Sequence, residues 1–168
     1  MSELSDKNSN GQPSPEEPSA PLHTTEYADA VNVKLGYRAL IVDDNAVSQK
    51  LLALSLSLQP QVGEIEFADS GKSAIQKAKA QIYDIIFLDA VMPEMDGYEA
   101  CYRLRKIPHY KTTPIIMVTG LTSPLDEARA IIVGSTSYIT KPVEQKHFKE
   151  VVSREIALIE FKKNLKTD

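Results

Sequence analysis

The stretch Asp84-Ile85-Ile86-Phe87-Leu88-Asp89-Ala90-Val91-Met92-Pro93 decides the fold that we expect for this chain of 168 residues. An apolar run leads to one carboxylate, Asp89, in a loop that Pro93 and then Asp96-Gly97 turn back. A run this short, bounded by turn residues, predicts a strand that is buried on both faces. Asp89 then lies at the carboxyl end of a central strand, where open α/β sheets bind their ligands.

Three further apolar runs also end in polar side chains. Asp43 and Asp44 follow the run 39–42, Thr119 follows 115–118, and Lys141 follows 137–140. Taken singly, an acid pair of this kind is more often a helix cap, and the threonine and lysine have no meaning. Together, four strand ends present an acid pair, an acid, a hydroxyl and an amine. We interpret this set as a phosphoryl site with a metal.

Strands and helices alternate strictly along residues 37–161. Apolar runs predict strands at 37–42, 64–67, 82–88, 115–118 and 136–140. The intervening segments have helical spacing, among them Val47, Leu51, Leu54 and Leu58 before Pro60, and Leu125, Ala128 and Ile132 after the capping Ser123. A last helix is predicted from Glu144 to about Phe161. Five such units predict an α/β fold, a parallel sheet with helices on both faces.

Composition favours a soluble cytoplasmic protein. No apolar run approaches the roughly 20 residues that cross a bilayer, and the first residues lack a signal-peptide pattern. The single cysteine, Cys101, rules out an internal disulfide and suits a reducing compartment. Residues 1–36 contain six acids and two lysines, which accounts for the whole net charge of −4. The remainder is neutral, so we expect no membrane association and no direct DNA binding.

Three segments follow from the same patterns. Residues 1–36 form an acidic leader: 1–22, rich in Ser, Pro, Glu and Asn, are expected to be disordered, and 23–36 irregular. Residues 37–161 form one domain, and 162–168 form a C-terminal tail. Because the chain ends soon after the last predicted helix, we expect no DNA-binding or enzymatic output domain.

The predicted strand ends suit phosphoryl chemistry. Asp43, Asp44 and Asp89 are oxygen ligands for a hard cation such as Mg²⁺ (or Mn²⁺), with the main-chain carbonyl of Val91 as a further candidate. Asp89 is the nucleophile, which would form an acyl phosphate. Lys141 and Thr119 can contact phosphoryl oxygens, because transfer of this kind depends on positioning and charge neutralisation.

These motifs resemble the response-regulator receiver domain of two-component signalling over residues 36–161. The matching pieces are Ile-Val-Asp43-Asp44, Asp89-Ala-Val-Met-Pro-Glu-Met-Asp-Gly, Val-Thr119-Gly120 and Tyr138-Ile-Thr-Lys141-Pro142. The intervals of 30 residues from Asp89 to Thr119 and 52 from Asp89 to Lys141 also match. Within the family, residues 97–101 and 132–142 are similar to regulators of type IV pilus twitching motility.

The resemblance implies a flavodoxin-like, doubly wound sheet of order 2-1-3-4-5. It implies that Asp89 is phosphorylated by a histidine kinase or a histidine phosphotransfer protein, and that Tyr138 turns inward when Thr119 moves. It also implies a cis bond before Pro142. Output would be a phosphorylation-dependent protein contact on the face of the helix after Ser123, the strand 136–140 and the last helix, with a phosphorylation-dependent homodimer as one form.

Two alternatives to a phosphorylation switch stay open. One is a receiver-like scaffold that never turns over phosphate, although the chain keeps the residues that such scaffolds usually lose. The other is a phosphatase with an aspartyl nucleophile, resembling haloacid dehalogenases, which place an acid where this chain has Val91. We therefore expect no enzyme beyond self-phosphorylation and dephosphorylation. The apolar Val91 and Leu121 predict slow hydrolysis of the acyl phosphate.

Overall fold

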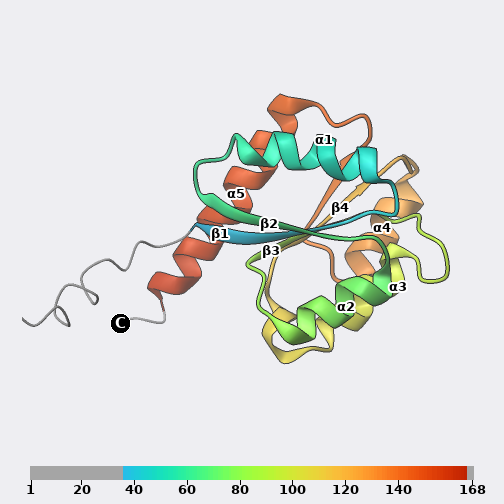
Figure 1. The fold of residues 1–168 in the computed structure, drawn as a ribbon, viewed down its shortest axis with the longest axis horizontal. Helices are drawn as coiled ribbons and strands as arrows, with labels where there is room; N and C mark the ends of the chain where they lie inside the picture. Colours follow the sequence, from blue (N-terminus) through green and yellow to red (C-terminus); the bar gives the residue numbers. More distant parts are fainter. Residues whose placement is uncertain (1–35, 166–168) are drawn as a thin grey trace, which may run out of the picture. The chain divides into compact units, whose positions relative to one another are not determined.

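The computed structural model describes residues 36–165, so the leader predicted for 1–36 lies outside it except for Gly36. Five strand–helix units follow one another (Figure 1). The strands are β1 (Tyr37–Val42), β2 (Val62–Ala68), β3 (Ile85–Leu88), β4 (Ile115–Thr119) and β5 (Ser137–Thr140). The helices are α1 (Ala46–Ser57), α2 (Gly71–Ala80), α3 (Gly97–Arg105), α4 (Pro124–Val133) and α5 (Gln145–Asn164), with a 3₁₀ turn, η1 (Pro108–Lys111), after α3.

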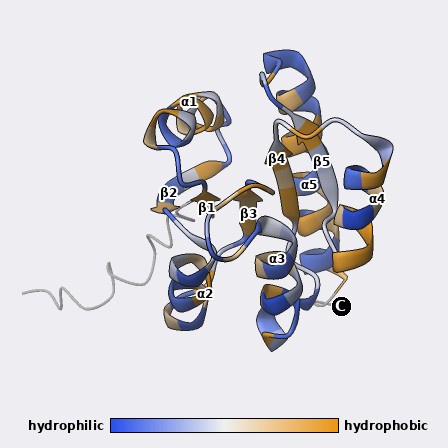
Figure 2. Ribbon diagram, turned by 90° about the vertical axis from the view of Figure 1, so that its right-hand side faces the viewer, coloured by the Kyte–Doolittle hydropathy of each residue, from blue (hydrophilic) through white to orange (hydrophobic). Residues whose placement is uncertain are grey.

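The strands form one sheet in the order β2-β1-β3-β4-β5, and every neighbouring pair is parallel. This confirms the predicted fold class and strand order. Helices α1 and α5 cover one face of the sheet, and α2, α3 and α4 cover the other (Figures 1 and 2). The reversal of strand order around β1 and β3 opens a crevice outside their carboxyl ends, which is the usual ligand position in such sheets.

The central strand β3 shows why its sequence is apolar without interruption. Ile86 and Leu88 pack into the core beneath α2 and α3, whereas Ile85 and Phe87 pack into the core beneath α1 and α5. Successive side chains of a strand point to opposite faces, so a strand covered on both sides needs an apolar residue at every position. Burial of β3 on both faces confirms the interpretation of the run 84–88.

Turn residues begin the helices on the same edge of the sheet. Asn45 accepts hydrogen bonds from the amides of Val47 and Ser48 at the start of α1. The Ser70, Asp96 and Ser123 side chains cap α2, α3 and α4 in the same manner. Each cap satisfies main-chain donors that a helix start leaves without partners. Short loops therefore connect strand ends directly to helix starts.

Two helices turn a different face to the sheet from the one that their apolar spacing indicates. Val47, Leu51, Leu54 and Leu58 are each more than 60% exposed, and α1 buries Leu52, Ser55 and Leu56 instead. In α4, Leu125 and Ile132 are exposed and Ala130 is the buried residue. Apolar residues at helical spacing therefore do not by themselves identify the side of a helix that faces the core.

The largest differences from the predicted bounds lie in β2, β3 and α5, whereas β4 and β5 differ by one residue each. Strand β2 is longer at both ends than 64–67, and β3 begins at Ile85, because Ile82 is exposed and the Asp84 carboxylate accepts the amide of Arg38. Helix α5 continues to Asn164, three residues into the predicted tail. Within residues 36–165, no helix is both long enough and apolar enough to cross a bilayer.

Candidate functional site

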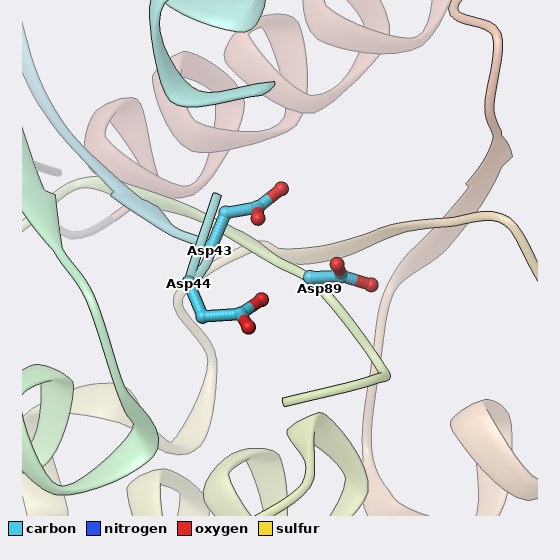
Figure 3. Close-up of side chains that lie close together, drawn as sticks. All are labelled: Asp43, Asp44 and Asp89. Atoms are coloured by element: carbon cyan, nitrogen blue, oxygen red, sulfur yellow. The ribbon is translucent and has the colours of Figure 1, made fainter. Parts of the chain in front are cut away.

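The predicted site residues meet at one edge of the sheet. Asp43 and Asp44 directly follow β1, Asp89 directly follows β3, Thr119 ends β4 and Lys141 directly follows β5. Figure 3 shows the three aspartates side by side, with their carboxylates in a common space. Because parallel strands share the direction of their carboxyl ends, positions far apart in the chain are brought together here.

The three carboxylates form a compact acidic cluster. One oxygen from each of Asp43, Asp44 and Asp89 lies within 4.8 Å of the others. Asp43 and Asp89 are buried, whereas Asp44 is exposed. Main-chain amides hold the two buried groups: Asn45 donates to Asp43 Oδ1 at 2.8 Å and Val91 donates to Asp89 Oδ1 at 3.1 Å. Three like charges this close repel one another, so the cluster favours a neighbouring cation.

The donor set fits a hard divalent cation. It consists of oxygens alone, and exposure of Asp44 leaves one side open to the waters that Mg²⁺ usually keeps. Val91, whose carbonyl was predicted as a further ligand, follows Asp89 in the same loop, and its side chain is 57% exposed. Its contribution as a ligand stays a prediction.

Lys141 is the cation that the structure places at this cluster. Its Nζ lies 2.7 Å from Asp43 Oδ2 and 3.1 Å from Asp89 Oδ2. Burial at the rim acts to lower the pKa of Lys141, but the hydrogen bonds and negative charges of Asp43 and Asp89 outweigh it and raise the pKa. The lysine is therefore fully charged at neutral pH. The peptide bond between Lys141 and Pro142 is cis, as the resemblance implied.

Thr119 and Tyr138 both contact Leu121, in the loop that follows β4. The buried Thr119 hydroxyl accepts the Leu121 amide at 3.3 Å. The half-buried Tyr138 donates its hydroxyl to the Leu121 carbonyl at 3.0 Å. The two residues predicted as the switch are thus linked through one loop residue.

Gln49 is a residue beside the site that no motif or periodicity in the sequence singles out. From α1, its side-chain amide donates to the carbonyls of Asp43 at 2.7 Å and Ala68 at 3.0 Å. It therefore ties the ends of β1 and β2 together behind the acid pair. A glutamine in a helix is common on any solvated surface, so only the position of the two carbonyls reveals this contact.

The loop after Asp89 depends on Gly97. The Gly97 amide donates to the Ala90 carbonyl at 2.9 Å and closes the loop. A Cβ at this position would overlap the main-chain oxygen of Asp89. The predicted Asp96-Gly97 turn is therefore required for the position of Asp89 as well as for the start of α3.

Comparison with known proteins places this geometry in a family. A family model described as "Response regulator receiver domain" matches residues 39–153. The signal transduction histidine-protein kinase BarA of Escherichia coli (strain K12) is 33% identical over 121 residues, which cover 72% of this chain and 13% of that kinase. The chain therefore spans about an eighth of the length of this curated relative.

Two solved structures have the same fold over nearly their whole length. The chemotaxis protein CheY4 of Vibrio cholerae is 31% identical with a TM-score of 0.66, over 71% of this chain and 98% of that chain. The receiver domain of the sensor histidine kinase PA1611 of Pseudomonas aeruginosa PAO1 is 27% identical with a TM-score of 0.66, over 73% of this chain and 98% of that one. The latter structure has a magnesium ion coordinated in its active-site cleft.

Proposed function

Because the chain belongs to the response regulator receiver domain family, we propose that Asp89 is its phosphoacceptor. Receivers of this family take phosphoryl groups from histidine kinases or histidine phosphotransfer proteins, and the partner class of this chain is the same. The observation that carries the assignment is the position of Asp89: a buried carboxylate at the end of the central strand, paired with Lys141 and grouped with two further acids.

The transfer balances with groups of this chain and the donor. A carboxylate oxygen of Asp89 attacks phosphorus, and the new P–O bond makes an acyl phosphate. The P–N bond of the phosphohistidine breaks, and its electron pair stays on the imidazole nitrogen of the donor. Asp89 attacks as a carboxylate, and the charged Lys141 ammonium lies 3.1 Å from its Oδ2.

Asp43, Asp44 and Asp89 would hold Mg²⁺ or Mn²⁺, with the Val91 carbonyl as a further ligand. When bound, the cation supplies positive charge for the phosphoryl oxygens and the acidic cluster. The protein's own contribution is to hold the three carboxylates at fixed positions: the Asn45 and Val91 amides orient two of them.

Lys141 and Thr119 take the remaining phosphoryl oxygens in this proposal. Lys141 exchanges its bond to Asp89 for a charge-assisted bond to the phosphoryl group. The Thr119 hydroxyl donates a hydrogen bond, and the movement of the loop that follows changes the position of Tyr138. Output is a phosphorylation-dependent contact with a downstream protein on the face of α4, β5 and α5, with a homodimer through that face as one form.

The chain acts as a signalling domain rather than as a catalyst for other substrates, and its family is not in itself a catalytic one. Self-phosphorylation and dephosphorylation are its only proposed reactions. We assign it to the cytoplasm, because Cys101 is a buried free thiol that suits a reducing compartment. If this segment belongs to a longer protein, the other parts of that protein would have activities of their own besides this phosphorylation switch.

Two observations disfavour the alternatives. An aspartyl phosphatase of the dehalogenase type would need an acid at the position of Val91, which is apolar and exposed. A phosphate-independent scaffold would not need an acid cluster and a charged lysine that face each other at the same strand ends.

Intact mass after incubation with acetyl phosphate and Mg²⁺ tests the assignment, with Asp89→Asn as the matched variant. We expect one metal-dependent phosphoryl adduct on the native chain and none on the variant. An adduct that persists in Asp89→Asn would move the acceptor elsewhere. No adduct on a folded native chain, from acetyl phosphate or from a phosphorylated histidine phosphotransfer protein, would favour the scaffold.

A further inference from the structure

Tyr98 is a buried phenol that the proposed function does not use. It lies in the first turn of α3 and is 3% exposed. Its hydroxyl donates to the main-chain oxygen of Asp126, in the first turn of α4, at 3.4 Å. A buried phenol needs a partner for its hydroxyl, and this partner belongs to a different helix. Tyr98 therefore joins the starts of α3 and α4.

Arg129 closes the same contact from the side of α4. Its guanidinium lies over the Tyr98 ring, 4.1 Å from the centroid. The same group pairs with Asp96, the capping residue of α3, at 3.3 Å. A cation over an aromatic ring is attracted by the electrons of its face, so Arg129 holds the ring while it holds the helix cap.

Tyr138 brings the switch to the same place. Its hydroxyl donates to Leu121, and both Tyr138 and Leu121 pack against the core cluster that contains Tyr98. Burial, foremost, raises the pKa of both tyrosines, and the proximity of Tyr98 raises that of Tyr138 further. Both phenols therefore stay neutral, each with one proton to donate.

Both hydroxyl protons are engaged with main-chain carbonyls near the start of α4. Tyr98 donates to the Asp126 carbonyl, and Tyr138 donates to the Leu121 carbonyl. The loop that contains Leu121 leads into α4 through the capping Ser123, and Asp126 lies in the first turn of that helix. The two phenols therefore hold the two ends of the same short segment.

We propose that Tyr98 is a positioning residue that couples the loop between β4 and α4 to the contact between α3 and α4. The loop residue Leu121 is bonded to Thr119 on one side and to Tyr138 on the other. When this loop moves, the hydrogen bond from Tyr98 to Asp126 changes as well. The contact between the first turn of α4 and the start of α3 then changes with it. Only the movement of this loop on phosphorylation, through Thr119, rests on the proposed function. The hydrogen bond from Tyr98 to Asp126 is present without phosphorylation.

Hydrogen–deuterium exchange in Tyr98→Phe tests the coupling in the full chain. The variant keeps the ring and the Arg129 contact and removes only the hydroxyl. Amides 121–127 should exchange about three- to tenfold faster than in the native chain, since a hydrogen bond that holds this turn is lost. Addition of beryllofluoride with Mg²⁺, as a phosphoryl mimic, should then change exchange at 121–127 less than it does in the native chain.

Tyr102→Phe is the matched control, because Tyr102 lies on the same helix with 53% of its surface exposed. It should leave exchange at 121–127 as in the native chain. The double variant Tyr98→Phe/Tyr138→Phe gives a second readout. If the hydroxyls act together, its effect on exchange is smaller than the product of the two single effects.

Native exchange at 121–127 in Tyr98→Phe, or a double variant equal to the product of the singles, would overturn the coupling. The melting temperature of each variant shows whether a change in exchange reflects general destabilisation. The double variant shows whether the effect of removing one hydroxyl depends on the presence of the other. A native chain that shows no response to beryllofluoride would count against the proposed phosphosite, while exchange without the mimic would still decide the role of Tyr98.

Discussion

Lys141 Nζ lies closer to Asp43, at 2.7 Å, than to the proposed phosphoacceptor Asp89, at 3.1 Å. The lysine thus neutralises Asp43, a proposed metal ligand, as well as the proposed nucleophile, and both carboxylates are nearly buried. Its removal should therefore have opposite effects on two reactions that a structural defect would impair together.

Lys141→Met should slow phosphorylation by acetyl phosphate while Mg²⁺ binding is retained or strengthened. Loss of a charge-assisted bond of roughly 1.5–3 kcal/mol predicts a rate about tenfold to hundredfold lower. Mg²⁺ becomes the principal cation left for the repelling carboxylates, so its affinity should not fall. The growth of the adduct mass with time measures the phosphorylation rate, and a titration with Mg²⁺ measures the affinity. Lys146→Met is the control, because Lys146 is exposed. A parallel loss of both would contradict this account of Lys141.

Asp44→Asn should weaken Mg²⁺ binding by about tenfold or more, because one of the three proposed oxygen ligands loses its charge. Asp69→Asn is the control: Asp69 is an exposed acid in the neighbouring recess but lies outside the cluster of three. The rise in melting temperature with Mg²⁺ reports the affinity, since a ligand of the folded state stabilises it in proportion to ln(1 + [L]/Kd). Equal responses in both variants would show that overall acidity, not the cluster, attracts the cation.

Much of this site could be predicted because it lies at strand ends. Apolar runs such as 39–42 and 115–118 are short, continuous and followed by polar residues, so both the strand and the residue at its end are visible in the sequence. Parallel strands in alternation with helices then place those ends on one edge. The order β2-β1-β3-β4-β5 came from the family resemblance, since alternation alone is compatible with other orders.

Contacts between helices and loops could not be predicted in this way. Gln49 reaches two main-chain carbonyls, and Tyr98 reaches a carbonyl of α4, through geometry that exists only after the elements pack. Such side chains follow no period and no motif. The prediction of the core-facing side of α1 was wrong for another reason. Apolar residues at helical spacing look the same in the sequence whether they face the core or the surface.

The apolar side chains at Val91 and Leu121 should give a long-lived acyl phosphate. They can neither orient an attacking water nor hydrogen-bond the phosphoryl group, and Val91 is exposed beside Asp89. Val91→Asn and Leu121→Glu should therefore shorten the lifetime of the adduct, which decay of the phosphorylated mass after removal of acetyl phosphate measures. Lifetimes equal to that of the native chain would mean that water access is controlled elsewhere.

Gly97→Ala should lower both stability and phosphorylation. The added Cβ overlaps the Asp89 carbonyl, so the loop must move away from the nucleophile, at a cost of about 1–3 kcal/mol. Gly120→Ala is the comparison variant: Gly120 follows Thr119 at the same edge of the sheet, and a Cβ there would meet no atom within 4 Å. Stability in urea unfolding and adduct formation should therefore be impaired more by Gly97→Ala than by Gly120→Ala. A Gly97→Ala variant with native behaviour in both assays would show that the loop adapts freely.

Leu56→Ala and Leu51→Ala test which face of α1 supports the fold. Leu56 is fully buried beneath the sheet, so its truncation should cost about 2–5 kcal/mol of unfolding free energy. Leu51 is 63% exposed, and its truncation should stay within about 0.5 kcal/mol. Both changes remove the same atoms from the same helix, so helix propensity cancels in the comparison. Urea unfolding of the full chain measures both. Equal losses would mean that the leucine stripe of α1 is covered, and that the apolar spacing of Val47, Leu51, Leu54 and Leu58 marks a buried face after all.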